Sequence, residues 1–351
     1  MENSEEHESR YYIKYGDDSL RCIICPRMCV IKPGERGFCN TKVNKDNRLI
    51  NLTYGRLSAL AIDPIEKKPL FHFHPGSLSL SISSIGCSFT CPWCQNWHLS
   101  QSKPEELRTK HMSPREIVAS AKRQECTSIS YTYNEPLINL DYVEDCSRLA
   151  RAKDIKNVLV TNGYVSKQAL NSILDVIDAA NVDWKSFSEP FYRKYCSADL
   201  KSVLDATVEM KKRGVHVEVT FLIIPEVHDA ENETREMAKY LVENLGPDTP
   251  LHLSRFFPNY KFTHLPPTPV EKLIKARDIA WKMGVKYVYV GNLPGEGYED
   301  TLCPRCSKPV IRRIGFDVVD WHLDEDNCCN YCGEPIPVIG KREKHENVFW
   351  F

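Results

Sequence analysis

Two spacings of hydrophobic residues alternate along the middle of the chain. Short apolar runs rich in β-branched residues predict strands, and longer stretches with apolar residues three or four positions apart predict helices with one buried face. The predicted strands are 78–85, 127–133, 157–161, 182–187, 216–224, 251–257 and 286–290. The predicted helices are 113–124, 142–153, 166–179, 200–213, 232–245 and 269–283. Strands that alternate with helices predict a parallel sheet with right-handed crossovers.

Local signals at several helix ends support this assignment. Ser113 precedes Pro114 and Glu116, a combination typical of a capping box with proline at the first helical position. Gly214 and Gly284 follow the last periodic residues of two other predicted helices, where a C-cap glycine is expected.

The alternating region is too short for a closed eight-unit barrel, which takes about 250 residues. The predicted fold is therefore α/β, with a partial TIM-like barrel of six βα units, (βα)6. The chain divides into a Cys-rich N-terminal segment (1–75), the partial barrel (76–294) and a zinc-ribbon-like segment with a tail (295–351).

Composition excludes several functional classes. The chain has 46 Lys and Arg against 47 Asp and Glu, a net charge of −1, so nucleic-acid binding is not indicated. No apolar run approaches the roughly 18 residues of a membrane span, and the polar start holds no signal-peptide pattern. The expected location is cytoplasmic.

Cysteines are unusually frequent, with 15 in the chain. Without an export signal, clustered cysteines favour metal binding over disulfides. Three groups stand out: Cys22, Cys25, Cys29 and Cys39; Cys87, Cys91 and Cys94; Cys303, Cys306, Cys329 and Cys332. The remaining cysteines are expected to be small buried hydrophobic residues: Cys126, Cys146, Cys196 and Cys328.

The central group has the spacing C-x3-C-x2-C and directly follows the first strand of the alternating region. Three thiolates on one loop can bind three corners of a [4Fe–4S] cluster and leave the fourth iron open. The alternative is a zinc ion with His98 as fourth ligand, which would make the chain a non-enzymatic metal-binding scaffold.

With Trp93 just before its third cysteine, this motif resembles the signature of the radical S-adenosylmethionine (SAM) superfamily. The resemblance implies a partial barrel of the radical SAM type and an enzyme whose open iron binds the amino and carboxylate groups of SAM. It also implies that an electron from the cluster cleaves SAM to a 5′-deoxyadenosyl radical, which takes a hydrogen atom from a substrate.

The resemblance extends to further cofactor-binding residues. Asn134 and Glu135 belong to a segment that binds the methionine amino group in the superfamily, although Tyr133 and Asn134 stand where two glycines are common, so the local backbone is expected to differ. The other implied residues are Trp93 and Asn96, around the adenine, and Thr161, Asn162, Asp183 and Lys185. Asp183 and Lys185 would also share one face of any strand and could simply pair.

A narrower resemblance covers nearly the whole chain. It rests on residues 63–70, 75–76, 94–97, 252–256 and 287–292. These segments resemble pyruvate formate-lyase-activating-enzyme-like proteins, specifically the radical SAM enzymes of the AmmeMemoRadiSam system. Glu226 is a departure, because the family usually has glycine there, so a changed turn is expected.

The resemblance implies a flavodoxin- or ferredoxin-like one-electron donor. The substrate is either a polypeptide, as in glycyl-radical activation, or a small molecule linked to companion proteins of that system. His252 and Arg255, at the end of the sixth strand, are expected to face it, with a structural ion pair as the alternative for Arg255.

The two outer cysteine groups predict further metal sites. Cys303, Cys306, Cys329 and Cys332 form two C-x2-C pairs typical of a structural zinc ribbon, with a mononuclear iron as alternative. For Cys22, Cys25, Cys29 and Cys39, zinc and a second iron–sulfur cluster remain equal alternatives.

Overall fold

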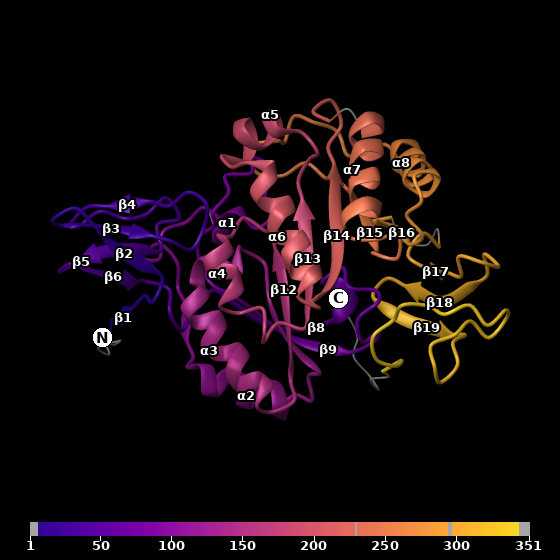
Figure 1. Cartoon of the computed structure of the whole chain (residues 1–351), viewed down its shortest axis with the longest axis horizontal. Coiled ribbons are helices and arrows are strands. Elements are labelled where there is room, and N and C mark those ends of the chain that lie inside the picture. The colour runs from indigo at the N-terminus through magenta and orange to yellow at the C-terminus, as the bar shows by residue number, and fades with distance from the viewer. Residues whose placement is uncertain (1–5, 229, 294–296, 344–351) are drawn as a thin grey trace.

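A twisted eight-stranded sheet forms the centre of the molecule (Figure 1). The computed structural model describes residues 6–228, 230–293 and 297–343. The sheet order is β16-β15-β14-β13-β12-β11-β9-β8. The strands are β8 (Ala59–Pro64), β9 (Leu78–Ser83), β11 (Ser128–Tyr131), β12 (Lys156–Thr161), β13 (Ala179–Trp184), β14 (His216–Ile223), β15 (Leu251–Arg255) and β16 (Val288–Gly291). All are parallel except β8, which runs antiparallel to β9.

The connecting helices confirm the predicted partial barrel. They are α2 (Pro114–Arg123), α3 (Leu140–Arg151), α4 (Lys167–Asn171), α6 (Leu200–Lys212), α7 (Ala230–Asn244) and α8 (Val270–Lys282). Each of these helices links two successive parallel strands, so six βα units precede β16. The sheet remains open, with β8 and β16 at its two edges.

The helix ends follow the local sequence signals. The Ser113 side chain accepts a hydrogen bond from the backbone N–H of Glu116, whose carboxylate accepts one from the backbone N–H of Ser113, as a capping box requires. Gly214 and Gly284 follow α6 and α8 with φ of 85° and 99°. These left-handed conformations confirm the predicted C-caps.

The region between β12 and β14 differs from the prediction. The predicted helix 166–179 ends at Asn171, and the strand predicted at 182–187 begins at Ala179 and ends at Trp184. Ala179 and Ala180 pair with β12, where small side chains are buried by the sheet. Alanine carries no strand signal of its own, so tertiary burial decided this boundary.

The N-terminal region forms small antiparallel sheets beside the barrel. Its strands are β1 (His7–Glu8), β2 (Tyr12–Tyr15), β3 (Ser19–Cys22), β4 (Val30–Ile31), β5 (Lys42–Lys45) and β6 (Arg48–Asn51), while β7 (Arg56–Leu57) pairs with β10 (Lys110–His111). Strand β8, within the segment 1–75, joins the central sheet instead.

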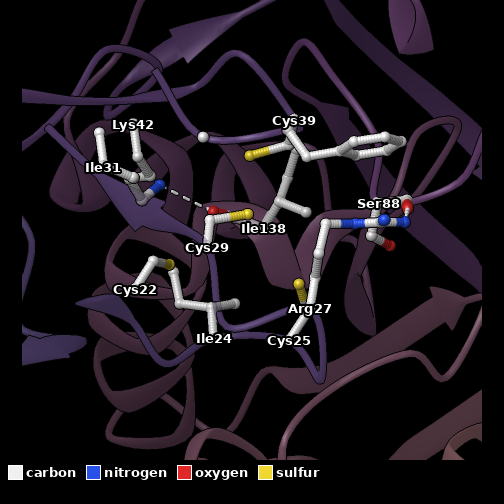
Figure 2. Close-up of a pocket in the computed structure, with 12 residues that line it drawn as sticks. Cys22, Ile24, Cys25, Arg27, Cys29, Ile31, Cys39, Lys42, Ser88 and Ile138 are labelled. Carbon is white, nitrogen blue, oxygen red and sulfur yellow. Dashed lines mark hydrogen bonds between the residues drawn. The ribbon is translucent and has the colours of Figure 1, made fainter. Parts of the chain in front are cut away.

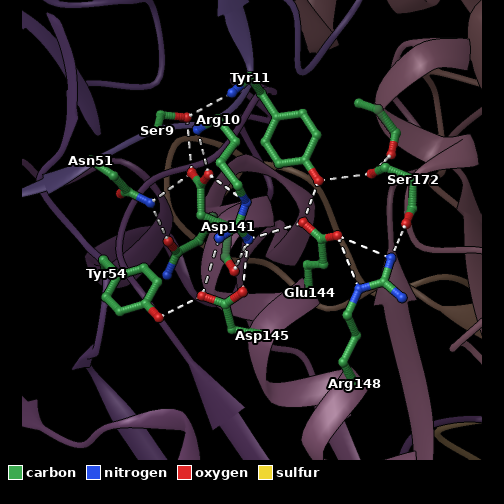
Figure 3. Close-up of polar contacts among 12 residues, drawn as sticks. Ser9, Arg10, Tyr11, Asn51, Tyr54, Asp141, Glu144, Asp145, Arg148 and Ser172 are labelled. Atoms are coloured by element: carbon green, nitrogen blue, oxygen red, sulfur yellow. Dashed lines mark hydrogen bonds and ion pairs between the residues drawn. The ribbon is translucent and has the colours of Figure 1, made fainter.

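Polar contacts attach this region to α3 (Figure 3). The Arg10 guanidinium lies 2.9 Å from Glu144 and 2.8 Å from Asp145. The buried carboxylate of Asp141 accepts hydrogen bonds from the Ser9 hydroxyl at 2.9 Å and the Arg10 N–H at 2.8 Å. Because Asp141 is fully buried, these bonds compensate its lost hydration and fix the N-terminal region on the barrel.

The C-terminal segment contains β17 (Thr301–Leu302), β18 (Pro309–Ile314) and β19 (Asp317–Trp321), on the side opposite the N-terminal sheets (Figure 1). Its small core includes Phe71, which precedes β9, together with Tyr287 and Tyr289 at β16. Arg313 also donates a hydrogen bond to the Phe71 carbonyl at 2.8 Å. Among the described residues, no helix combines the length and hydrophobicity of a membrane span.

Candidate active site

A cavity of about 330 Å³ lies at the carboxyl ends of the parallel strands. In barrels built from parallel strands, active sites form at this end, because the loops after successive strands meet there. Ten of the predicted cluster ligands and cofactor-binding residues, which come from separate loops, line it together: Cys87, Cys91, Trp93, Cys94, Asn96, Asn134, Glu135, Asn162, Asp183 and Lys185.

The loop after β9 carries the three central cysteines. Their sulfur atoms are not all within 4.8 Å of one another, so they do not have the compact arrangement of ligands around a single ion. His98 is exposed on the short helix α1 (Trp97–Ser100) and does not line the cavity. The arrangement therefore favours a multi-iron cluster over a zinc ion completed by His98.

Gly86 sets the position of this loop. Its φ is 90°, and a Cβ atom there would lie 2.7 Å from the Cys39 carbonyl oxygen and 2.7 Å from the Thr41 methyl group. The loop therefore contacts the N-terminal cysteine region directly.

We expect Gly86→Ala to destabilise the protein and reduce its iron content. Alanine would be strained at this φ by about 1–2 kcal/mol, and the contacts with Cys39 and Thr41 would add about 1–3 kcal/mol of overpacking. Gly214→Ala is a matched control, because Gly214 has a φ of 85° but no atom within 4 Å of the added Cβ. Chemical denaturation and iron analysis measure both effects; equal losses in the two variants would contradict the packing argument.

Glu135 is buried in the cavity wall after β11. Its carboxylate accepts hydrogen bonds from the Leu137 N–H at 3.0 Å, the Asn162 N–H at 2.7 Å and the Thr161 hydroxyl at 2.8 Å. Burial raises the pKa of Glu135 to about 7, although these hydrogen bonds act in the opposite direction. Thr161 itself does not line the cavity and is connected to it through this hydrogen bond to Glu135.

Asn162 connects Glu135 to the cysteine loop. Its side-chain amide donates to the Ser88 hydroxyl at 3.1 Å and lies 3.7 Å from the Cys87 sulfur. The ends of β11 and β12 and the loop after β9 are thus joined in one polar network.

Asp183 and Lys185 form an ion pair of 2.9 Å inside the cavity. Burial opposes the charge of Lys185, but Asp183 and the neighbouring thiols outweigh it and raise the pKa of Lys185. The pair confirms the same-face geometry, and its position beside Cys91 places it within the site.

Asn96 and Tyr133 close another side of the cavity. The Asn96 amide donates to the Tyr133 carbonyl at 2.9 Å. Tyr133 has a φ of 71°, in the left-handed region that favours glycine, and its hydroxyl donates to Asp63. Glu226 likewise has a φ of 67°. Both departures from the family's glycines therefore keep a conformation that glycine adopts easily.

His252 and Arg255 are not among the residues that line the cavity. The buried His252 ring contacts the Glu218 carboxylate at 2.6 Å, and the Arg255 guanidinium donates to the Thr268 carbonyl at 2.9 Å. Both side chains have structural partners in this conformation, and their contact with substrate stays a prediction.

Several residues that line the cavity are not among the site residues predicted from the sequence. Lys67, Lys68 and Tyr133 line the cavity, and Asp63 binds the ammonium groups of both lysines. Burial lowers the pKa of Lys68 to about 8, against the effect of Asp63. The run of charged residues from 63 to 68 was the available signal, but only the tertiary fold, which places Asp63 and Lys68 against the Tyr133 hydroxyl, brings it to the cavity. Cys196 is also buried, with its sulfur 3.9 Å from that of Cys91.

The C-terminal cysteines form a compact group. The sulfur atoms of Cys303, Cys306, Cys329 and Cys332 all lie within 4.8 Å of one another. Two of the distances are 3.6 Å, between Cys303 and Cys332, and 3.8 Å, between Cys306 and Cys329. Tetrahedral coordination with metal–sulfur bonds of about 2.3 Å gives sulfur separations of about 3.8 Å. The group therefore fits one tetrahedral metal ion.

Comparison with known proteins identifies the class. Residues 81–238 match the family model of the radical SAM superfamily. The chain is 45% identical over 333 residues to the uncharacterized protein MJ0808 of Methanocaldococcus jannaschii, covering 95% of this chain and 99% of the relative. The chain belongs to the radical SAM superfamily, whose domain implies a [4Fe–4S] cluster and SAM.

More distant similarities were also found. The uncharacterized protein MJ0674 of the same organism is 22% identical over 284 residues, covering 76% of each chain. A domain of pyruvate-formate lyase-activating enzyme from Bacteroides vulgatus has a TM-score of 0.42 at 14% identity, covering 47% of this chain and 99% of that structure. Streptococcus suis SuiB bound to S-adenosylmethionine has a TM-score of 0.47 at 13% identity, covering 65% and 53%.

Proposed function

We propose that this protein is a radical SAM enzyme that abstracts a hydrogen atom from a polypeptide substrate, in the manner of a glycyl-radical-activating enzyme. The observation that carries the chemistry is the single cavity shared by Cys87, Cys91, Cys94, Glu135 and the Asp183–Lys185 pair. The three cysteines would hold the [4Fe–4S] cluster, which when bound supplies the electron for SAM cleavage.

The surrounding residues have distinct roles in this proposal. Glu135, held by Thr161 and the Asn162 N–H, would bind the methionine ammonium group. Asp183 and Lys185 present opposite charges at 2.9 Å and would orient polar groups of the cofactor. Trp93 and Asn96 would frame the adenine. A flavodoxin- or ferredoxin-like protein would provide the electron.

The size of the cavity favours a substrate that enters from outside. Its volume of about 330 Å³ is near the lower end of the roughly 300–1,000 Å³ of small-molecule sites. A nucleoside cofactor bound at the cluster would fill most of this space, so the substrate would meet it from the open mouth of the barrel. This arrangement suits a polypeptide segment. Modification of a small molecule is the second candidate.

Transfer of deuterium distinguishes the two substrates. An extract of deuterated cells would first be separated by ultrafiltration into macromolecules and small molecules. Each fraction would then be incubated with reduced enzyme and SAM. We expect 5′-deoxyadenosine to acquire deuterium only from the macromolecular fraction. If this fraction is treated with protease before the incubation, the 5′-deoxyadenosine should remain unlabelled. Deuterium acquired only from small molecules would overturn the polypeptide substrate. Absence of 5′-deoxyadenosine from fully iron-loaded, reduced enzyme in every fraction would contradict the enzymatic function.

We expect Glu135→Gln to weaken SAM binding by about 10- to 100-fold, because a hydrogen bond to a charged group contributes about 1.5–3 kcal/mol. The pKa of about 7 adds a pH dependence with a defined sign. The ionised carboxylate binds an ammonium group better, so wild-type affinity should fall by up to about tenfold per pH unit below pH 7. Equilibrium binding to the reconstituted protein between pH 6 and 8 measures both effects.

Glu233→Gln is the matched control. Glu233 is also a buried glutamate that accepts a backbone hydrogen bond, from Phe187 at 2.9 Å, but it does not line the cavity. Its variant should keep wild-type affinity and pH dependence. If Glu135→Gln bound SAM as tightly as this control and with the same pH profile, Glu135 would not be a cofactor ligand.

A further inference from the structure

The four N-terminal cysteines surround one small space beside the barrel (Figure 2). The backbone N–H of Cys22 donates to the Cys29 carbonyl at 3.0 Å, and a turn closed by the Met28 N–H and the Cys25 carbonyl at 3.1 Å carries Cys25. Cys39 comes from a second turn, where the Asn40 N–H donates to the Gly37 carbonyl at 2.9 Å. Two separate loops therefore direct four thiols toward the same place.

The spacing of these thiols differs from that of the C-terminal group. No three sulfur atoms among Cys22, Cys25, Cys29 and Cys39 all lie within 4.8 Å of one another, whereas the four C-terminal sulfurs do. Sulfurs around one zinc ion would be separated by about 3.8 Å. The central cysteines, whose superfamily implies an iron–sulfur cluster, are also more widely spaced. Wider spacing is expected when each thiolate binds a different iron of a cubane.

The charges around this space fit a cluster with four thiolate ligands. Arg27 and Lys42 line it, and no acidic residue is among the lining residues that the structure describes. The buried Lys42 ammonium donates to the Ile138 carbonyl at 2.8 Å, and Arg27 donates to the Ser88 carbonyl at 3.2 Å. Four thiolates make an iron–sulfur cluster anionic, so two fixed cations beside it stabilise its charge.

We propose that Cys22, Cys25, Cys29 and Cys39 hold a second [4Fe–4S] cluster, which passes electrons to the central cluster. The cluster assignment stands on the spacing and charges of these residues, while the electron transfer rests on the proposed radical SAM function.

The two cysteine regions meet at the loop after β9. Ser88 lines the N-terminal space, whereas the adjacent Cys87 lines the active-site cavity. Gly86 approaches Cys39 so closely that an added Cβ would lie 2.7 Å from its carbonyl oxygen. A low-potential one-electron donor would reduce the N-terminal cluster by one electron. That cluster would return to its oxidised form as the central cluster takes up the same electron, with no bond made or broken.

Iron, sulfide and zinc analysis of anaerobically reconstituted full-length protein tests the cluster. We expect about eight irons and eight sulfides per chain, and about four of each in a Cys25→Ala/Cys29→Ala variant. A Cys126→Ala/Cys146→Ala variant, which removes two buried cysteines outside the three groups, should retain all eight. About four irons with two zinc ions in the wild type would overturn the second cluster and leave the proposed function intact.

Electron paramagnetic resonance separates the two clusters and tests the transfer. In a Cys87→Ala/Cys91→Ala/Cys94→Ala variant, the remaining reduced cluster should give a signal that does not respond to SAM, because four cysteines leave it no open iron. In Cys25→Ala/Cys29→Ala, the SAM-responsive signal of the central cluster should remain. The rate at which this signal forms after mixing with reduced flavodoxin should fall to a small fraction of the wild-type rate. An unchanged rate would overturn the transfer, and a SAM-responsive signal in the first variant would overturn the assignment of the N-terminal ligands.

Discussion

Cys91→Ala is expected to remove the central iron–sulfur cluster and abolish formation of 5′-deoxyadenosine from SAM. Cys91 is buried at the cavity wall, between Cys87 and Cys94 in the sequence. Iron–sulfur clusters are held by cysteine thiolates, and the non-cysteine residues that line the described cavity would not replace a thiolate ligand. Cys87→Ala and Cys94→Ala should have the same effect. Iron content and product formation under dithionite measure the loss, after subtraction of iron at the other cysteine groups.

Cys196→Ala provides a stringent control for this prediction. The Cys196 sulfur lies only 3.9 Å from that of Cys91 and is also buried. If three cysteines bind the cluster and leave one iron open for SAM, the Cys196 variant should keep both cluster and activity. Loss of the cluster in Cys196→Ala would instead identify a fourth protein ligand and contradict the open iron.

Cys306→Ser is expected to release about one zinc ion and lower the free energy of unfolding of the C-terminal segment by about 4 kcal/mol or more. The four sulfur atoms lie close enough to surround one ion, and four thiolates around a tetrahedral zinc would leave no position for substrate or water. Cys303 and Cys329 belong to the same small core as Val310, Ile311 and Leu323, so loss of a bound metal should also loosen this core. The central cluster should remain loaded in the protein that folds.

The adjacent Cys328 supplies the control for this second prediction. It lies beside Cys329 in the sequence but outside the compact group of four. Cys328→Ser should therefore retain zinc and stability. Metal analysis and thermal unfolding of both variants decide the role. Loss of one iron instead of zinc in Cys306→Ser, together with slower electron uptake, would favour the mononuclear iron alternative.

Much of the barrel was predictable because its signals are local. The capping box at Ser113 and the glycines after α6 and α8 act within one helical turn, and they are found where expected. The boundary of β13 was not predictable in the same way. Ala179 and Ala180 become strand residues because β12 pairs with them and buries them, a condition that depends on distant parts of the chain.

The residues that would bind the cofactors of a radical SAM enzyme are predicted from the amino-acid sequence alone. Ligand chemistry and spacing within one loop, as in Cys87, Cys91 and Cys94, are properties of a short segment. The charged run that includes Lys67 and Lys68 reaches the cavity only in the folded chain, where Lys68 meets Tyr133 from the loop after β11. Likewise, the separations of the sulfur atoms distinguish a compact group from two wider ones. The tertiary structure alone decided these features, because distances between separate loops depend on how the whole sheet packs.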